Sequence, residues 1–217
     1  MSGRGGSTRG PESPAEALDL LDWRRRVFSL YAEVRSKAAS DPRAAWRLWR
    51  ETRDELFRTH PQSPIPAPER AAFAGLVYYE YDPALRVSGT LMGRPAARIE
   101  VPASTGEPVA FTSMGACRFE LGGAERSVDA YWLDAYGGGV FLPFRDATAG
   151  RETYGAGRYL LDTVKGADLG PSGADGLVLD FNFAYNPSCA YDPSWACPLA
   201  PAANRLGIEV RGGERMP

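Results

Sequence analysis

Two stretches in the C-terminal half of this 217-residue chain carry residue types from which a reactive site is built. The first, residues 144–159, combines two acids, three arginines, two threonines and two tyrosines with glycines that let a backbone approach a ligand closely. Arginine adds a planar fork that suits a carboxylate or a phosphate. We predict that this stretch contacts a small molecule through Asp146, Thr148, Tyr154 and Arg158. The alternative is that Asp146 and Arg158 only hold the loop together.

The second stretch, residues 180–204, begins with alternating polar and apolar residues. The alternation predicts a strand with Asp180 and Asn182 on one face and Phe181 and Phe183 on the other. A carboxylate beside an amide is unusual for a plain core strand, so we predict ligand contacts here. The predicted binding residues are Asn182, Tyr185, Asn186, Cys189, Tyr191 and Asn204. The alternative is that the asparagines satisfy backbone groups of a long irregular loop.

The chemistry that these residue types favour is proton transfer. Two of the carboxyl groups Asp146, Asp180 and Glu152 form a general acid–base pair if they meet in a pocket. Tyrosine hydroxyls from both stretches could donate hydrogen bonds to a developing oxyanion. If the protein is an enzyme, we therefore expect Asp146, Tyr154, Arg158 and Asp180 to be catalytic.

The cysteines and the single histidine give weaker evidence for a reactive site than these two stretches do. The chain has three cysteines, Cys117, Cys189 and Cys197, and this small, odd number argues against a disulfide scaffold. One disulfide between the last two is still possible. The seven residues between those two do not fit zinc-ligand spacing, and we expect no metal. Cys189 as a nucleophile would need a base, and His60 is the only histidine. We instead place His60 at the end of a helix, where a cation favours the helix dipole.

Two N-terminal helices should help to position these stretches. Ser13 and the following proline predict the start of the first helix, and Asp41 with its own proline starts the second. The second helix should end before His60-Pro61, because a residue that precedes proline avoids helical geometry. The apolar residues at helical spacing are Leu20, Trp23, Val27, Tyr31 and Val34 in the first helix and Trp46, Trp49, Leu56 and Phe57 in the second.

Many short strands should follow, separated by glycine and proline turns. They are predicted near residues 76–81, 86–91, 97–101, 109–112, 116–121, 126–133, 140–143, 159–162, 177–183 and 206–210. The pattern predicts a mainly β, α+β fold in which the two helices pack on an antiparallel β-sandwich or small β-barrel. The expected divisions are a disordered tail (1–12), a helical pair (13–60), a proline-rich connector (61–72) and a β-rich domain (73–217) that is one cooperative unit with the helices.

The overall composition excludes several classes of protein. The net charge of −2 points to neither nucleic acid nor an anionic membrane as a partner. No apolar run is long enough to span a bilayer, and Met1 to Pro11 lacks the apolar region of a secretory signal. We therefore expect a cytoplasmic location, where thiols are kept reduced.

The motifs quoted above also resemble a known family. The sequences FRDATAGRETYGAGRY (144–159), DFNFAYNPSCAY (180–191) and CPL (197–199), with HPQSP (60–64) and FAGL (73–76), look like the signature of the bacterial and archaeal domain of unknown function 1684. The resemblance covers residues 46–214. It implies a shared fold and a shared site, and it implies no particular reaction. The residues of that implied site are Asp146, Tyr154, Arg158, Asp180, Asn182, Asn186, Cys189 and Asn204.

Three functions follow from these observations. The first is a small-molecule pocket, formed by residues 144–159 and 180–204, that supports acid–base chemistry without metal or cofactor. The second is a non-catalytic structural or interaction module. The third, which rests on fold analogy alone, is a flavin-binding enzyme of the split-barrel type. We leave a homodimer open.

Overall fold

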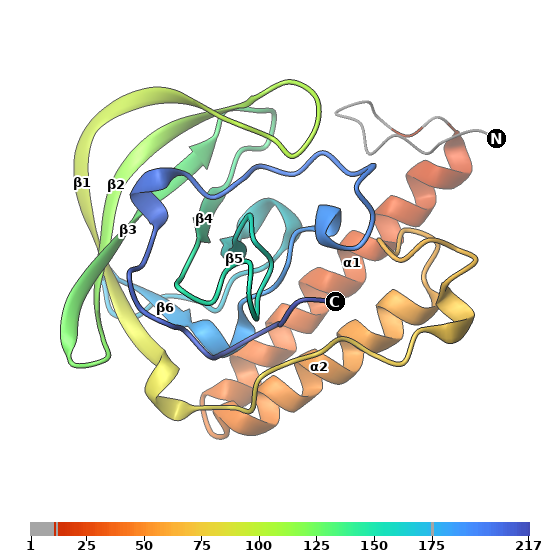
Figure 1. Cartoon of the computed structure of the whole chain (residues 1–217), viewed down its shortest axis with the longest axis horizontal. Coiled ribbons are helices and arrows are strands. Elements are labelled where there is room, and N and C mark those ends of the chain that lie inside the picture. Colours follow the sequence, from red (N-terminus) through yellow and green to blue (C-terminus); the bar gives the residue numbers. More distant parts are fainter. Residues whose placement is uncertain (1–10, 12, 175) are drawn as a thin grey trace.

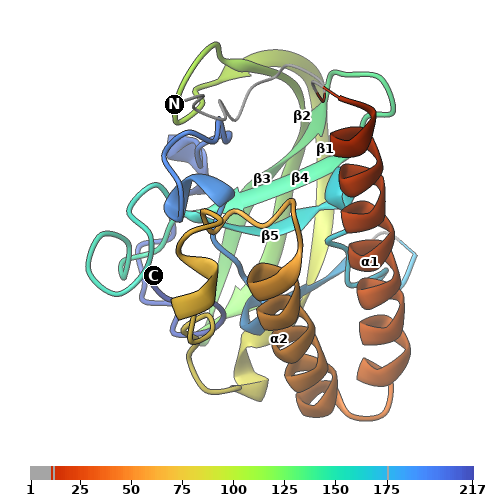
Figure 2. The same ribbon diagram turned by 90° about the vertical axis from the view of Figure 1, so that its right-hand side faces the viewer.

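The computed structural model describes residues 11, 13–174 and 176–217. The tail predicted at residues 1–12 therefore lies outside the described residues except for Pro11. Within these residues, two α-helices and six strands make up the main regular structure, with the helices stacked side by side against one side of a strongly curled sheet (Figures 1 and 2). Among the described residues, no helix has the length and apolarity that crossing a lipid bilayer requires.

The helices form where their capping residues predicted. Helix α1 spans Pro14–Ala38, and the Ser13 side chain accepts a hydrogen bond from the Glu16 backbone at 3.2 Å. Helix α2 spans Pro42–Thr59 and is capped in the same way by Asp41. Its C-cap, His60, has extended backbone geometry, as expected before proline. The predicted apolar residues of α2 are all buried, whereas α1 is buried mainly along its second half.

The sheet is antiparallel throughout, in the order β5-β4-β3-β2-β1-β6. Its strands are β1 (Arg86–Val101), β2 (Val109–Leu121), β3 (Ala124–Leu133), β4 (Val140–Phe144), β5 (Arg158–Asp162) and β6 (Gly176–Asp180). The predicted fold class is therefore confirmed, as two helices on a six-stranded half-barrel.

The two longest strands were each predicted as two short ones. The glycines near the predicted breaks do not end the strands. They lie instead at irregularities of strand register, after Gly93 in β1 and between Ser113 and Gly115 in β2. Gly115 has a φ of +125°, and a Cβ there would lie 2.2 Å from the Met92 carbonyl oxygen. The bulge therefore needs glycine, and it lets one long strand pair curl around the core.

The two edges of the half-barrel are joined by the chain that leaves β6. Tyr185, five residues after that strand, exchanges backbone hydrogen bonds of 2.9 and 3.1 Å with Tyr159 on β5, at the opposite edge. This isolated bridge satisfies backbone groups that an open edge strand would leave exposed. It also brings the two polar stretches of the sequence next to each other.

Two strand predictions were wrong, and a third strand was predicted to extend too far. Residues 76–81 make one isolated bridge, Tyr78 to Glu214, because they run beside the C-terminal segment and not in the sheet. Residues 206–210 bond to the irregular loop after β4 and form no strand. The strand predicted to reach Phe183 ends at Asp180, whose carboxylate accepts the Asn182 backbone N–H at 3.0 Å and starts a 3-10 turn.

The apolar residues form two main clusters. One lies between the helices and the sheet and contains Trp49, Phe111, Tyr159 and Phe183. The other lies within the curl of the sheet and contains Phe144 and Phe181, among others. Because of the turn at Asp180, Phe181 and Phe183 enter different clusters and do not share one strand face. The chain after β6 (blue in Figure 1) crosses the open side of the half-barrel.

Candidate functional site

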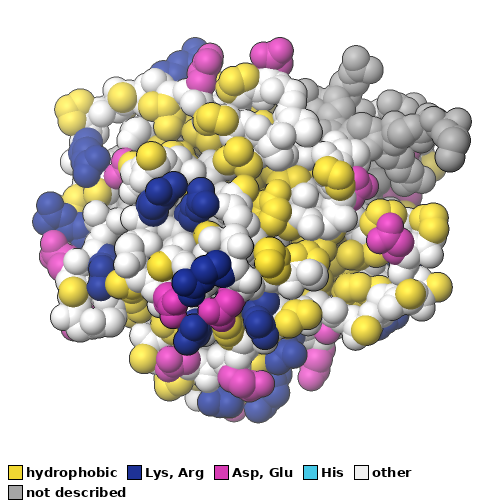
Figure 3. All heavy atoms as spheres, in the orientation of Figure 1, with side chains coloured by type: hydrophobic (Ala, Val, Ile, Leu, Met, Phe, Trp, Pro, Cys, Tyr) yellow, Lys and Arg dark blue, Asp and Glu magenta, His cyan; other side chains and the backbone are white. Residues whose placement is uncertain are grey.

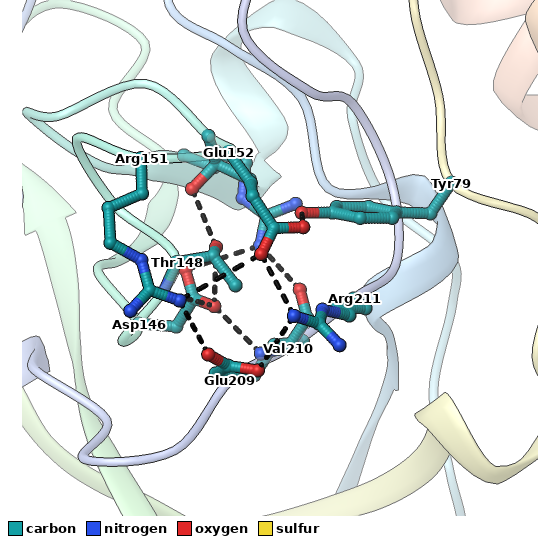
Figure 4. Close-up of polar contacts among 10 residues, drawn as sticks. Tyr79, Asp146, Thr148, Arg151, Glu152, Glu209, Val210 and Arg211 are labelled. Atoms are coloured by element: carbon teal, nitrogen blue, oxygen red, sulfur yellow. Dashed lines mark hydrogen bonds and ion pairs between the residues drawn. The ribbon is translucent and has the colours of Figure 1, made fainter.

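Asp146, the first predicted catalytic residue, lies at the centre of a hydrogen-bonded loop. Its buried carboxylate accepts bonds from the Thr148 hydroxyl (2.8 Å), the Val210 backbone N–H (2.7 Å) and the Arg158 guanidinium (3.3 Å) (Figure 4). Thr148 is buried as well, and its hydroxyl also contacts that of Thr153. The contacts of Asp146 therefore tie the 144–159 loop to the C-terminal segment.

Arg158 makes the same connection from the other side. Its guanidinium is fully buried and donates to three carbonyl oxygens, of Val210 (2.9 Å), Gly212 (2.5 Å) and Glu214 (3.1 Å). It also lies over the Phe144 ring, 5.0 Å from the centroid. Burial lowers the pKa of Arg158, and the neighbouring Asp146 opposes that shift. The Arg158 guanidinium is therefore bound to the protein's own backbone, and it has no face turned to solvent.

The outer rim of this loop is a group of exposed ion pairs. Arg151 contacts Glu209 at 2.6 Å, and Arg211 contacts Glu152 at 2.9 Å and Glu209 at 3.1 Å (Figure 4). The Tyr79 hydroxyl donates to Glu152 at 3.0 Å. Figure 3 shows Lys/Arg and Asp/Glu side chains lying side by side on this face. Exposed pairs of this kind contribute little to stability individually, and they close the loop against the C-terminal segment.

Asp180 and Asn182 lie together, as predicted, but inside the protein. Asp180 is fully buried and accepts from Arg86 (3.0 Å) and from the Asn182 side-chain amide (2.8 Å). Asn182 bonds to both the backbone N–H and the carbonyl of Asp82, at 2.9 and 2.7 Å. Burial raises the pKa of Asp180, and its hydrogen bonds oppose that shift.

Asn204 and Tyr185 also bond within the fold. The Asn204 side chain accepts from the Tyr131 hydroxyl (3.1 Å) and donates to the Pro143 carbonyl (2.6 Å), so it links strands β3 and β4. Tyr185 forms the bridge to Tyr159 already described, and its ring lies against the guanidinium of Arg53, 5.1 Å from the centroid.

Asn186 and Tyr191 meet around a carboxylate that the sequence analysis did not single out. Glu214 is fully buried, lies 3.1 Å from Arg53 of α2, and accepts bonds from the Asn186 backbone N–H (2.7 Å) and the Tyr191 hydroxyl. Burial raises the pKa of Glu214, and Arg53 opposes this. The Arg53–Glu214 pair thus connects a helix to the C-terminus. The sequence analysis did not predict this ion pair, because its two residues lie 161 positions apart.

Cys189 is where the two predicted stretches meet through side chains. The Tyr154 hydroxyl lies 3.6 Å from the Cys189 sulfur, and Cys197 is the neighbour that lowers the pKa of Cys189 most. Ser104, from the β1–β2 connection, exchanges hydrogen bonds with the Cys197 backbone: its N–H donates to the Cys197 carbonyl at 2.9 Å, and its hydroxyl accepts at 3.0 Å. We call these four residues, Ser104, Tyr154, Cys189 and Cys197, the thiol junction.

The thiol junction favours a charged Cys189. The hydrogen bond from Cys197, with further contacts from Ser104 and Tyr154, lowers the pKa of Cys189 to about 6, against the opposing effect of burial. The Ser104 hydroxyl donates to the Trp195 carbonyl at 2.8 Å. The bond to Cys189 raises the pKa of Cys197, whose thiol therefore keeps its proton.

The surroundings of the thiol junction are partly open. Both sulfur-bearing residues are buried, with 6% of Cys189 and 3% of Cys197 exposed, but Tyr154 and Ser104 are only partly buried. The Lys165 ammonium, paired with Asp162 at 3.5 Å, interacts electrostatically with both thiols. His60 lies elsewhere, with Asp22 3.1 Å from its Nε2 atom. Tyr154 and Ser104 therefore form the more exposed part of the junction.

The two best-formed hollows of the described structure lie outside this region. Both lie along β1, the β2–β3 turn and their neighbours, and their linings include Ser88, Glu120 and Gly123. None of the predicted site residues lines either hollow. In the described part of the chain, no three His, Cys, Asp or Glu side chains gather in a way that could hold a metal ion.

Comparison with known proteins gives the family. The family model described as "Protein of unknown function (DUF1684)" matches residues 71–215, which is well over half of the chain. The chain belongs to the DUF1684 family. The resemblance inferred from the motifs is thereby confirmed, and the match spans the whole half-barrel and every predicted site residue.

A solved structure resembles this DUF1684 protein over most of its length. The solution NMR structure of an uncharacterized protein of Haloarcula marismortui is 34% identical in sequence, with a TM-score of 0.61. The match covers 82% of this chain and 96% of that one. The comparison with curated proteins gave no match. DUF1684 membership thus identifies the fold and leaves the function to be argued from the site.

Proposed function

We propose that this DUF1684 protein binds a small molecule at the thiol junction, and that Cys189 is the reactive side chain there. The observation that carries the proposal is the contact between the Tyr154 hydroxyl and the Cys189 sulfur at 3.6 Å, because it joins the two stretches predicted to form a site. Cys189 acts as a nucleophile toward a small electrophile.

The electrostatics support this role for Cys189. A thiolate is the nucleophilic form of cysteine, and the hydrogen bonds at the junction stabilise that form near neutral pH. Burial, followed by the contact with Cys189, raises the pKa of Tyr154, so its hydroxyl keeps a proton that it can donate. The junction therefore combines a charged nucleophile with a proton donor.

The proposal changes the role of the predicted carboxylates. Asp146, Arg158 and Asp180 are buried and bonded to groups of the protein itself. We propose that they position the two stretches and do not transfer protons to a substrate. Arg158, between Gly157 and Tyr159, is only a few residues from Tyr154 in the sequence. Its hydrogen bonds to the C-terminal carbonyl oxygens therefore hold the chain close to Tyr154.

The test is site-specific alkylation combined with ligand screening. Iodoacetamide should modify Cys189 at least about tenfold faster than Cys117 near pH 7, because burial raises the pKa of Cys117 to about 11. A panel of small electrophilic metabolites is then screened for thermal stabilisation, with Cys189→Ser as the site variant and Cys117→Ser as the matched control. A ligand whose stabilisation survives Cys189→Ser, or a Cys189 no more reactive than Cys117, would contradict the proposal.

A second candidate is a non-catalytic structural or interaction module. It is supported by the internal bonding of Asp146, Asp180, Asn182 and Asn204, which act as ties within the fold. The same alkylation experiment separates it from the first candidate, since a purely structural Cys189 should be as unreactive as Cys117. The absorbance of the purified protein in the visible range tests the flavin alternative.

A further inference from the structure

An arginine of helix α2 lies over two aromatic rings. The Arg50 guanidinium carbon is 4.5 Å from the centroid of the Trp46 ring and 4.7 Å from that of the Tyr78 ring. Trp46 lies one turn earlier on α2, and Tyr78 belongs to the segment that runs back along this helix (Figure 1). Contacts with two ring faces hold the guanidinium in place, although no hydrogen bond does so.

The hydrogen-bonding capacity of Arg50 is unused within the described part of the chain. Its Nε atom is buried and has no hydrogen-bond partner there. The two terminal nitrogens have no partner among the described residues either, but they are not buried, so this edge of the guanidinium faces solvent. Arg50 therefore presents fixed, unpaired donors at the surface of the protein.

The indole of Trp46 shows the same lack of an acceptor. Trp46 is only 3% exposed, and its Nε1 atom has no partner among the described residues. The described residues contain four buried side-chain atoms of this kind, and two of them belong to Trp46 and Arg50. Buried donors without an acceptor cost free energy, so their concentration here points to an acceptor from outside the chain.

The next arginine of α2 shows that ring contacts do not require unpaired donors. Arg53 lies 4.9 Å from the centroid of the Trp49 ring, donates to the Tyr78 hydroxyl at 3.4 Å and pairs with Glu214 at 3.1 Å. The protein therefore neutralises Arg53 internally, whereas it supplies no carboxylate to Arg50.

Arg47 adds a second unpaired cation next to Arg50. It is exposed, makes no hydrogen bond or ion pair with the described residues, and precedes Arg50 by three positions, so the two are neighbours on the helix surface. The acids of α2 do not neutralise them. Asp54 accepts the Leu76 backbone N–H at 2.9 Å, Glu55 pairs with Arg58, and Glu51 forms no ion pair with either arginine.

We propose that Arg50 and Arg47 bind the phosphoryl group of a small molecule, with Arg50 as the fixed fork and Arg47 as the second cation. A planar guanidinium donates two parallel hydrogen bonds to an oxyanion, and the ring contacts hold its donors in position before the ligand arrives. Two neighbouring cations favour a phosphate dianion over a carboxylate, which carries a single charge. This site shares no residue with the thiol junction, so either proposal can fail without the other.

The test is titration of the ¹⁵N-labelled full chain with inorganic phosphate, followed by NMR at pH 7 and constant ionic strength. The probes are the Nε–H signal of Arg50, identified by its absence in Arg50→Lys, and the indole N–H signal of Trp46. Both should shift with phosphate and saturate. Acetate at the same ionic strength should cause a much weaker shift, because it brings one charge.

Three variants assign the binding to these side chains. Arg50→Gln should weaken phosphate binding about tenfold or more, followed through the Trp46 signal. Arg50→Lys keeps the charge but loses the planar fork, and it should also weaken binding. Arg205→Gln is the matched control, because Arg205 is exposed and has no side-chain partner in the described part of the chain. It changes the net charge equally and should leave binding within about twofold of the wild type.

Three results would overturn the proposal. The first is the absence of a saturable shift of the Arg50 signal in the wild type. The second is an equal response to acetate, which would exclude phosphoryl selectivity. The third is a loss of binding in Arg205→Gln as large as in Arg50→Gln, which would reveal general charge attraction. Should the Arg50 variants not fold, Arg47→Gln decides the question, since Arg47 is exposed and its removal should weaken binding roughly threefold.

Discussion

The hydroxyl of Tyr154 lies 3.6 Å from the sulfur of Cys189, and this contact joins a loop between strands β4 and β5 to a turn 35 residues further along the chain. The same two segments are also joined by the backbone bridge between Tyr159, five residues after Tyr154, and Tyr185, four residues before Cys189. A hydroxyl at this place stabilises the charged sulfur, so its removal has a predictable effect.

Substituting Tyr154→Phe should raise the pKa of Cys189, since one of the hydrogen bonds that lower it is lost. The midpoint of iodoacetamide alkylation against pH, expected near pH 6 in the wild type, should move upward by roughly one pH unit or less. Tyr136→Phe is a suitable control, because Tyr136 is fully exposed. An unchanged midpoint in Tyr154→Phe would mean that the 3.6 Å contact contributes nothing to the thiolate.

Removing the guanidinium of Arg158 should destabilise the whole fold. In Arg158→Met the buried carboxyl group of Asp146 loses its cationic partner, and three carbonyl oxygens lose their donor. The expected loss in the free energy of unfolding is about 3–5 kcal/mol, measured by urea denaturation.

Two further variants show whether that loss comes from the buried charge. The double variant Asp146→Asn with Arg158→Met should recover part of the stability, because no unpaired charge remains. Glu125→Gln, in the exposed pair with Arg118 at 3.9 Å, should change stability by about 0–1 kcal/mol. A loss as large in Glu125→Gln as in Arg158→Met would contradict the assignment of Arg158 as a buried clamp.

Local signals predicted the parts of this fold that depend on neighbouring residues. Ser13 and Asp41 cap the two helices because the side chain, the proline after it and the first turn are all adjacent in sequence. The strands from residue 86 to residue 162 follow in the same way from alternation and glycine turns. Residues 76–81 looked like a strand but pair with the C-terminus, which no local pattern encodes.

The candidate site could be located from sequence but not assembled from it. The density of polar and aromatic residues pointed to Tyr154 and Cys189, yet nothing showed that Ser104, some fifty residues before Tyr154, would bond to the backbone of Cys197. Asp180 was predicted to face a ligand because the alternating strand was extended to Phe183, three residues too far. The carboxylate instead accepts the Asn182 backbone N–H, ends the strand and turns inward.

The buried pair of Arg53 and Glu214 should make stability depend on pH. Burial raises the pKa of Glu214 in the folded state above its ordinary value of 4.5. As the pH rises above about 4.5, the unfolded chain therefore releases this proton before the folded protein does, and the folded state becomes relatively less stable. Compared with Glu214→Gln, which does not titrate, the wild type should lose stability as the pH rises from 4.5 through the folded pKa.

Urea denaturation of both proteins at several pH values measures this difference. Glu55→Gln is the control, because Glu55 lies on the surface, with 61% of its side chain exposed in its pair with Arg58. If the wild type instead gains stability relative to Glu214→Gln as the pH rises, the effects of Arg53 and Tyr191 outweigh burial, and the pKa of Glu214 is lowered.

Gly157 lies where the two polar stretches touch, and alanine should not be tolerated there. Its φ is +102°, and an added Cβ would lie 2.6 Å from the Phe144 carbonyl oxygen and 2.9 Å from the Ala200 Cβ. Gly157→Ala should therefore cost more than about 1 kcal/mol of unfolding free energy. Gly207→Ala is the matched control, since nothing lies within 4 Å of a Cβ at that position and the change should be nearly neutral.

The same substitution tests the thiol junction itself. The Gly157 backbone N–H donates to the Tyr154 carbonyl at 3.0 Å, so a shift of Gly157 displaces the residue that contacts Cys189. Alkylation of Cys189 in Gly157→Ala should then move to higher pH, in the same direction as in Tyr154→Phe, whereas Gly207→Ala keeps the wild-type profile. If Gly157→Ala is destabilised but retains that profile, Tyr154 is held at Cys189 by contacts other than this turn, and the geometry of the junction does not depend on Gly157.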